Sequence, residues 1–233
     1  MTFAPFILFF LTSCPFTNPT EGLKMYSVCK ISNVVSITGS GSDPQWKKAR
    51  QLTDFTYPWE KIKPPPTTFR ALHNTDWVYF MFEVTDDHIV LSGDSDDKAA
   101  VGSSSRAEIF FRIDEKLAPY YGLELDPRGR VLDYQATYYR KFNPAWSWPR
   151  TDLQLKTSVS KTGYIIEFAV SKASLRALSL LKNNRLEAGL FRADCLHEGA
   201  TIDNFRWASW IKPDSKTPDF HLPSSFGMLQ LED

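Results

Sequence analysis

The sequence predicts an all-β fold, specifically an antiparallel β-sandwich of the jelly-roll type with one short helix. Short runs rich in aromatic and β-branched residues recur along most of the 233-residue chain, and such runs are typical of strands. Turn residues separate them, as in Asp126-Pro127-Arg128-Gly129, which is the spacing expected of a sandwich or jelly roll. Hydrophobic residues make up 42% of the chain, enough for one substantial core. We therefore expect one folded domain rather than two small ones.

The expected strands follow one another at short intervals. They span residues 68–73, 77–85, 106–113, 120–126, 131–138, 153–159, 164–170, 186–194, 206–210 and 226–231. One helix is expected at 171–181, because Ser171 can cap its N-terminus and Leu175, Leu178 and Leu181 share one face.

The first 25 residues have the features of an export leader followed by a tether, so the folded domain is expected at 26–233. The run 4–11 is apolar but too short to span a bilayer. It ends in Leu11-Thr12-Ser13-Cys14, which resembles the lipobox of bacterial lipoproteins and implies that Cys14 is lipidated. No Lys or Arg precedes the apolar run, so an ordinary disordered leader is the alternative. With a lipidated Cys14, the protein is expected to be exported and anchored to a membrane, in the periplasm or at the cell surface.

Charge and cysteine content exclude two classes of partner. Lys plus Arg equals Asp plus Glu at 27 each, so no basic surplus points to nucleic acid. The scattered histidines and cysteines show no zinc-ligand spacing. In an exported protein Cys29 and Cys195 could form a disulfide, and two free buried thiols are the alternative.

Charged residues alternate with apolar ones along several expected strands, which predicts a charged sheet face. These residues are Arg106, Glu108, Arg112, Glu124, Asp126, Arg192 and Asp194. If they share one face, ion-paired groups of both signs are suited to bind hydroxyl groups. The alternative is a solvated outer face with weak salt bridges.

The segment between the last two expected strands predicts an aromatic binding loop. Prolines at 213, 218 and 223 cannot donate to a sheet ladder and therefore indicate an ordered loop. Trp207 and Trp210 precede the loop, and Phe220 and His221 lie within it. Aromatic rings beside polar groups suit a ligand that is part apolar and part polyhydroxylated, such as a sugar. The alternative is that both tryptophans belong to the core.

Several segments carry a resemblance to a known family by their order and spacing. They are Trp46-x-x-Ala49, TFRAL at 68–72, VYFMFEV at 78–84, RAEIFF at 106–111, YYGLELDPRG at 120–129, GYIIE at 163–167 and PDFHLPSSFG at 218–227. From about Tyr26 to the C-terminus the chain resembles the carbohydrate-binding module family 9-like domains. The resemblance implies a β-sandwich of the kind found attached to xylanases or as stand-alone lipoproteins of polysaccharide-degrading bacteria.

The resemblance also implies positions for a sugar site. In sugar-binding members two tryptophans sandwich a terminal sugar, and the second position corresponds to Phe220, whose ring we expect to be exposed. The first falls at 102–105, where this chain has glycine and serines, so Trp146 and Trp148 are candidates for the lost platform. The family glutamate corresponds to Glu108, and Glu124 stands where the sugar-binding type carries arginine. Calcium is a candidate ligand by resemblance, but no Asp/Glu cluster in the sequence singles out a site.

The predicted function is non-catalytic carbohydrate binding on an exported lipoprotein that supports polysaccharide breakdown. Its partners would be an oligo- or polysaccharide and glycoside hydrolases acting on it. The candidate binding residues are Arg106, Glu108, Glu124, Trp146, Trp148, Arg192, Trp210 and Phe220.

Two other functions stay open. The first is a glycoside hydrolase that uses Glu108 and Glu124, since such enzymes need two carboxyl groups, one with a raised pKa. Nearby arginines are expected to lower both pKa values, which disfavours it. The second is a sandwich that holds haem or another cofactor, for which four histidines and four methionines are available as ligands.

Overall fold

The computed structural model describes residues 23–94, 97–198 and 201–233. The strands are β1 (Met25–Lys30), β2 (Thr67–His73), β3 (Trp77–Thr85), β4 (Arg106–Arg112), β5 (Tyr120–Leu125), β6 (Val131–Thr137), β7 (Lys141–Asn143), β8 (Leu153–Ser160), β9 (Gly163–Ser171), β10 (Arg185–Cys195), β11 (Phe205–Ser209) and β12 (Gly227–Leu231). The α-helices are α1 (Lys98–Gly102) and α2 (Lys172–Ala177), and short 3₁₀ turns occupy Pro44–Lys48, Arg150–Asp152, Ile202–Asn204 and Pro223–Ser225. The predicted leader, with Cys14, lies outside the described residues.

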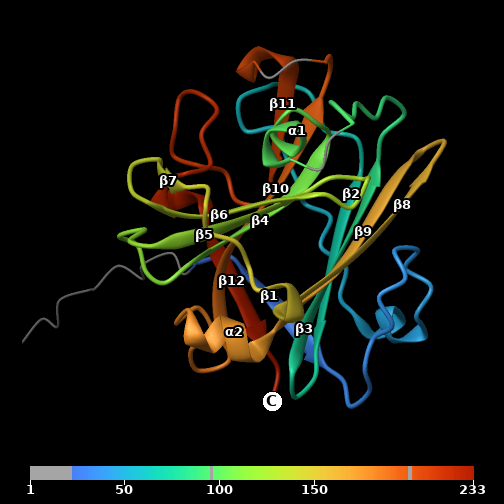
Figure 1. The fold of residues 1–233 in the computed structure, drawn as a ribbon, viewed down its shortest axis with the longest axis vertical. Coiled ribbons are helices and arrows are strands. Elements are labelled where there is room, and N and C mark those ends of the chain that lie inside the picture. Colours follow the sequence, from blue (N-terminus) through green and yellow to red (C-terminus); the bar gives the residue numbers. More distant parts are fainter. Residues whose placement is uncertain (1–22, 95–96, 199–200) are drawn as a thin grey trace, which may run out of the picture.

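The strands form one large curled sheet in the order β7-β6-β5-β4-β10-β12-β1-β2-β3-β9-β8, with β11 paired to β10 (Figure 1). Strand β1 joins the two halves of this sheet, and it runs parallel to both β12 and β2. All other strand pairs are antiparallel. The prediction of an all-β, sandwich-like fold is therefore confirmed. The purely antiparallel arrangement is wrong at β1, which begins the expected domain but was not among the expected strands.

The main core lies between the two halves of the sheet. Phe80 on β3 and Phe111 on β4 meet across it, with ring centroids 6.1 Å apart. A second cluster, which includes Phe110 and Phe191, covers the opposite face of β4 and β10. Every residue of β4 is therefore buried, as expected for a strand with both faces covered. The loop between β11 and β12 contributes Phe220 to this outer cluster and so covers part of the outer face of the sheet.

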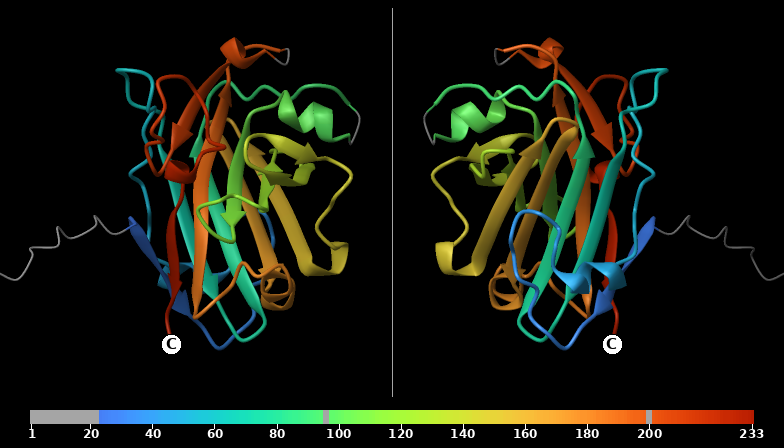
Figure 2. Two further views of the ribbon diagram at one scale, coloured as in Figure 1. Left: turned by 90° about the vertical axis from the view of Figure 1, so that its left-hand side faces the viewer. Right: turned by 90° about the vertical axis from the view of Figure 1, so that its right-hand side faces the viewer.

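The helices lie near opposite ends of the strands (Figure 2). Helix α2 is the predicted one, and the Ser171 side chain caps it by accepting a hydrogen bond from the Ser174 amide at 3.0 Å. It ends before Leu178, earlier than predicted, because Ser179 adopts a positive φ of 60°. Helix α1 was not predicted. Its five residues are too few for a periodic pattern, although Asp97 caps it through the Ala100 amide. Among the described residues no helix is long and apolar enough to cross a membrane.

Cys29 and Cys195 are both free thiols, so the disulfide alternative is wrong. Strand β1 pairs with β12, which in turn pairs with β10 at its Arg185 end. Cys195 is the last residue of β10, ten residues after Arg185, so the two ends of the strand are about 30 Å apart at the usual rise per residue. A disulfide requires Cα atoms about 4 to 7 Å apart, which this register prevents.

Candidate functional site

A pocket of about 320 Å³ opens on the outer face of β4, β5 and β6. The hairpin formed by β6 and β7 bounds one side, and the loop that follows β11 bounds another. Figure 1 shows this loop beside β7. Arg140 of the hairpin pairs with Asp219 of the loop at 3.2 Å, and both residues line the pocket.

The floor of the pocket contains one arginine and two glutamates. Glu108 on β4 lies directly opposite Glu124 on β5, so both side chains share the outer face. Arg106 lies between them, with Nε 2.7 Å from Glu124 Oε2 and Nη2 2.9 Å from Glu108 Oε1. All three side chains are buried. The predicted polar face is therefore present here, although it is shielded from bulk solvent.

Glu108 is the least satisfied member of this group. Burial and the neighbouring Glu124 raise the pKa of Glu108 to about 8, and the opposing effect of Arg106 is smaller. Arg106 therefore lowers this pKa as expected, but the expectation of a net lowering is wrong, because burial and Glu124 have the larger effect. Although Oε1 is within ion-pair distance of Arg106, it accepts no well-aligned hydrogen bond. The ion pair with Arg106 offsets part of the cost of burying this carboxyl group, and a ligand that donated to the carboxyl group would offset more of it.

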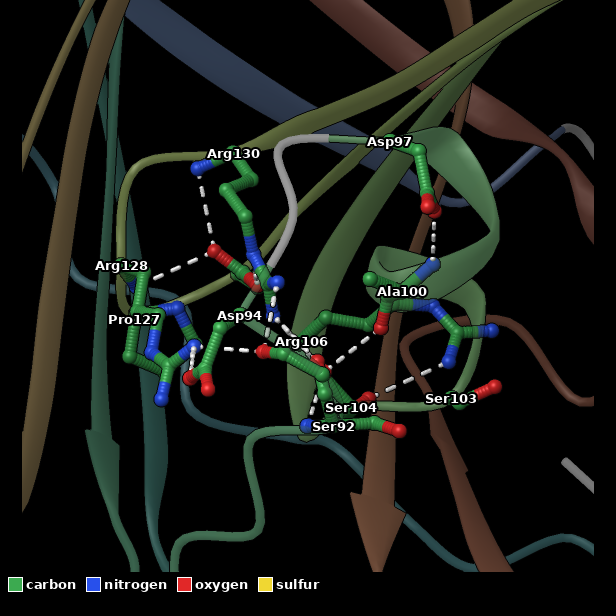
Figure 3. A network of polar contacts seen from close by, with 12 residues as sticks. Ser92, Asp94, Asp97, Ala100, Ser103, Ser104, Arg106, Pro127, Arg128 and Arg130 are labelled. Carbon is green, nitrogen blue, oxygen red and sulfur yellow. Dashed lines mark hydrogen bonds and ion pairs between the residues drawn. The ribbon is translucent and has the colours of Figure 1, made fainter. Parts of the chain in front are cut away.

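Arg106 is held in place by the loop between α1 and β4. Its Nη1 donates to the carbonyl oxygens of Gly102 at 3.0 Å and Ser104 at 3.2 Å. Ser104 is itself fixed, since its hydroxyl donates to the Ala100 carbonyl at 2.7 Å and accepts from Arg130 at 3.2 Å (Figure 3). The charged centre of the pocket is therefore positioned before any ligand arrives.

Glu124 is fully engaged by protein donors. Tyr134 on β6 donates its hydroxyl to Glu124 Oε1 at 3.0 Å, while Arg106 occupies the other oxygen. The Tyr134 ring lies against Gly122, where an added Cβ would fall 2.4 Å from the ring. Burial raises the pKa of Tyr134 well above its usual value, so this phenol stays protonated and continues to donate.

Aromatic side chains form the walls of the pocket. Phe220 lines it but is only 5% exposed, because its ring stacks on Phe191 with centroids 4.1 Å apart. It is therefore not the exposed ring that was expected. The more accessible rings are the half-buried Trp207 on β11 and Phe142 on β7, which is 42% exposed.

His221 also lines the pocket and is uncharged at neutral pH. Burial, with a smaller contribution from Arg140, lowers its pKa to about 3. Its ring stacks on Phe110 with centroids 5.2 Å apart, and Nδ1 lies 2.9 Å from the Tyr120 hydroxyl. His221 thus adds an apolar ring face and a neutral polar group to the wall.

Sequence reasoning missed Tyr134, Phe142 and Arg140. Tyr134 shares a face of its strand with the apolar residues Leu132 and Ala136 and is therefore easily taken for core, so its position over Gly122 could be found only from the register of β5 and β6. Phe142 lies in a three-residue strand, which is too short for a periodic signal.

Trp146 and Trp148 lie away from the pocket and do not replace the missing platform. Trp148 is 3% exposed and packs in the main core against Phe111, with centroids 6.0 Å apart. Its Nε1 donates to Ser174 at 3.0 Å. Trp146 packs on Tyr121, which belongs to the same core. Packing in the main core, rather than contact with a sugar, therefore accounts for both rings.

Arg192 and Trp210 also lie outside the pocket. In the register of β10 and β4, Arg192 pairs with Ala107 and therefore points to the face opposite Glu108. There it forms ion pairs with Asp86 and Asp194, each at 3.2 Å. Trp210 is 3% exposed in the main core. The assignment of Arg192 to the binding face was wrong because β10 is buried on both sides, so alternation alone does not show which side faces the site. For Trp210 the alternative holds, since the ring belongs to the core.

No group of three or more histidine, cysteine or acidic residues is arranged to hold a metal ion within the described ranges. The calcium implied by resemblance therefore has no site that the structure assigns.

A sandwich-like sheet with a charged pocket floor and aromatic walls defines a ligand-binding β domain. The carbohydrate family 9 binding domain-like family matches residues 37–233, and the chain belongs to that family.

Solved structures share this fold. A candidate carbohydrate-binding protein from Bacteroides uniformis ATCC 8492 is 18% identical with a TM-score of 0.69, over 91% of this chain and 100% of that one. A family 9 module from Caldicellulosiruptor kristjanssonii, solved with glucose, is 16% identical with a TM-score of 0.55, over 90% and 96%. The family 9 module from the same organism solved with cellotriose is 16% identical with a TM-score of 0.56, over 90% of this chain and 94% of that one. No curated protein matches the chain.

Proposed function

We propose that the pocket binds a saccharide without catalysing a reaction on it. The observation that carries this proposal is the Glu108 carboxyl group on the pocket floor, which is paired with Arg106 but has no well-aligned protein donor to Oε1. A sugar hydroxyl can donate to this carboxyl group, and above the Glu108 pKa of about 8, where the group is ionised, the hydrogen bond is charge-assisted and stronger than a neutral one. Phe142 and Trp207 offer apolar surface for the C–H faces of a sugar ring. Family membership and the glucose and cellotriose complexes of the structural relatives support the proposal.

The polar side chains of the pocket floor are held in place before a sugar binds. Arg106 is fixed by main-chain carbonyls, and Glu124 by Arg106 and Tyr134. Little conformational entropy is then lost from the protein when a sugar binds, which favours affinity. The test is a glycan array on the full chain, followed by calorimetric titration of each hit with the wild type and Glu108→Gln.

A glycoside hydrolase is the second candidate, and the raised pKa of Glu108 favours it. Glu108 and Glu124 are cross-strand partners, so their Cβ atoms are about 5 Å apart. We favour binding because Glu124 is buried and each of its oxygens accepts a protein hydrogen bond, which makes the group less basic and less nucleophilic. Incubation of array hits with the protein, assayed for new reducing ends, separates the two candidates.

A haem site receives no support from this pocket. One histidine and no methionine line it, and His221 is uncharged, stacked and hydrogen-bonded.

We further propose that the protein is exported and anchored by a lipid on Cys14, with residues 15–23 as the tether. The lipobox-like Leu11-Thr12-Ser13-Cys14 supports this proposal. An anchored binding domain would hold a polysaccharide near hydrolases and raise its effective concentration. Fractionation of cells that express the wild type or Cys14→Ala tests it.

A further inference from the structure

The exposed aromatic side chains of the described chain gather in one place. Those more than a third exposed are Tyr138 at 49%, Tyr139 at 48% and Phe142 at 42%, and all belong to the hairpin between β6 and β7. Exposed aromatic surface that clusters in this way marks interaction sites more often than single exposed residues do.

Tyr139 is exposed but held in place. Its hydroxyl donates to the Asp219 carboxylate. The same carboxylate accepts from Arg140 Nη1 at 3.2 Å and from the His221 amide at 2.9 Å. The Arg140 guanidinium also lies 6.0 Å from the centroid of the Tyr139 ring. A ring that is already positioned loses little entropy when a ligand covers it.

The aromatic surface begins where the pocket ends. Phe142, Arg140 and Asp219 line the pocket, whereas Tyr138 and Tyr139 do not. Tyr139 reaches the pocket rim through Asp219, and the two tyrosine rings are 5.4 Å apart. At about 320 Å³, the pocket is near the lower limit for ligand sites. A longer ligand must therefore leave the pocket beside exposed surface.

Resting on the proposed function, we propose that Tyr138 and Tyr139 form a second saccharide subsite outside the pocket. The subsite would contact the sugar units adjacent to the one held in the pocket. The protein would then recognise a saccharide chain rather than a single sugar. Continuity with the pocket and the polar rim formed by Arg140 and Asp219 favour a saccharide chain over a protein partner.

The test compares single sugars with short chains. Glucose, cellotriose, xylose and xylotriose are titrated calorimetrically into the full chain as wild type, Tyr139→Ala and Tyr139→Phe. Val159→Ala, at an exposed position of β8 in the other half of the sheet, is the matched control.

The wild type is expected to bind a trisaccharide more tightly than its monosaccharide. Tyr139→Ala should weaken trisaccharide binding by roughly three- to tenfold, the range expected for one aromatic contact, and leave monosaccharide binding unchanged. Tyr139→Phe keeps the ring and should keep most of the affinity. Tyr138→Ala repeats the test at a second exposed ring.

Four results would overturn the subsite. Equal wild-type affinity for both lengths, or equal losses for both lengths in Tyr139→Ala, would do so while leaving the pocket proposal intact. Unfolding of both alanine variants would show that the rings stabilise the fold instead. If the wild type binds none of the four sugars or any array glycan, both the subsite and the proposed function fail.

Discussion

Glu108→Gln should abolish most saccharide affinity without weakening the fold. Above pH 8, where Glu108 is ionised, the change keeps the size of the side chain but replaces a charged acceptor with a neutral amide. Removal of a hydrogen bond to a charged group costs about 1 to 3 kcal/mol, which is roughly a 5- to 150-fold rise in Kd. The assay is calorimetric titration with the tightest glycan from the array.

The stability of Glu108→Gln provides the internal control. The folded-state pKa of Glu108 is about 8, above the usual value of a glutamate. A carboxyl whose pKa is raised by folding destabilises the protein as pH rises from about 4.5 towards 8, because the unfolded chain ionises first. Removal of the carboxyl should therefore leave Tm at pH 7 unchanged or higher.

Glu124→Gln is the matched comparison, and its outcome should differ. Glu124 accepts hydrogen bonds from Arg106 and Tyr134, so its neutralisation should lower stability by about 1 to 3 kcal/mol. Unchanged affinity in Glu108→Gln would refute the role given to this carboxylate. Saccharide turnover by the wild type, lost in either variant, would show a hydrolase instead.

Four further outcomes are expected. Saccharide affinity should rise with pH and level off above about 8, because below that pH Glu108 must release its proton before the ionised group can bind. The affinity should change by up to about tenfold per pH unit, and an affinity that does not vary with pH would contradict this. Phe220→Ala should lower the free energy of unfolding, measured by urea titration, by about 3 to 5 kcal/mol, because the ring is stacked and buried. A variant of unchanged stability with weaker saccharide binding would show instead that Phe220 is an exposed binding ring. Gly122→Ala should cost about 1 to 3 kcal/mol and weaken binding, since its Cβ would displace the Tyr134 ring; unchanged Tm and Kd would contradict the packing. Cys14→Ala should move the protein from the membrane to the soluble fraction, and unchanged fractionation would rule out the anchor.

Strand positions were predictable because aromatic and β-branched residues recur between clear turns. Strands β2 to β6 and β8 to β12 fall within a few residues of the predicted runs. Strand β7 was missed because three exposed residues carry no pattern. Strand β1 was missed because its six residues follow the predicted tether.

The residues of the pocket floor were partly predictable from the sequence, and the errors in that prediction have a physical cause. Arg106, Glu108 and Glu124 alternate with apolar residues on neighbouring strands, and the register brings them together. Arg192 shows the same alternation but faces the other side. Both faces of β10 are buried, so no local pattern distinguishes them. Phe220 was misjudged because its contact with Phe191 joins segments far apart in sequence.

A crystal structure of the chain with its tightest array glycan tests the central claim most directly. We expect a sugar unit in the pocket between the β6–β7 hairpin and the loop after β11. One hydroxyl should lie within hydrogen-bond distance of the Glu108 carboxyl group, about 2.5 to 3.0 Å. A glycan bound elsewhere on the protein, with no contact to Glu108, would contradict the proposed function.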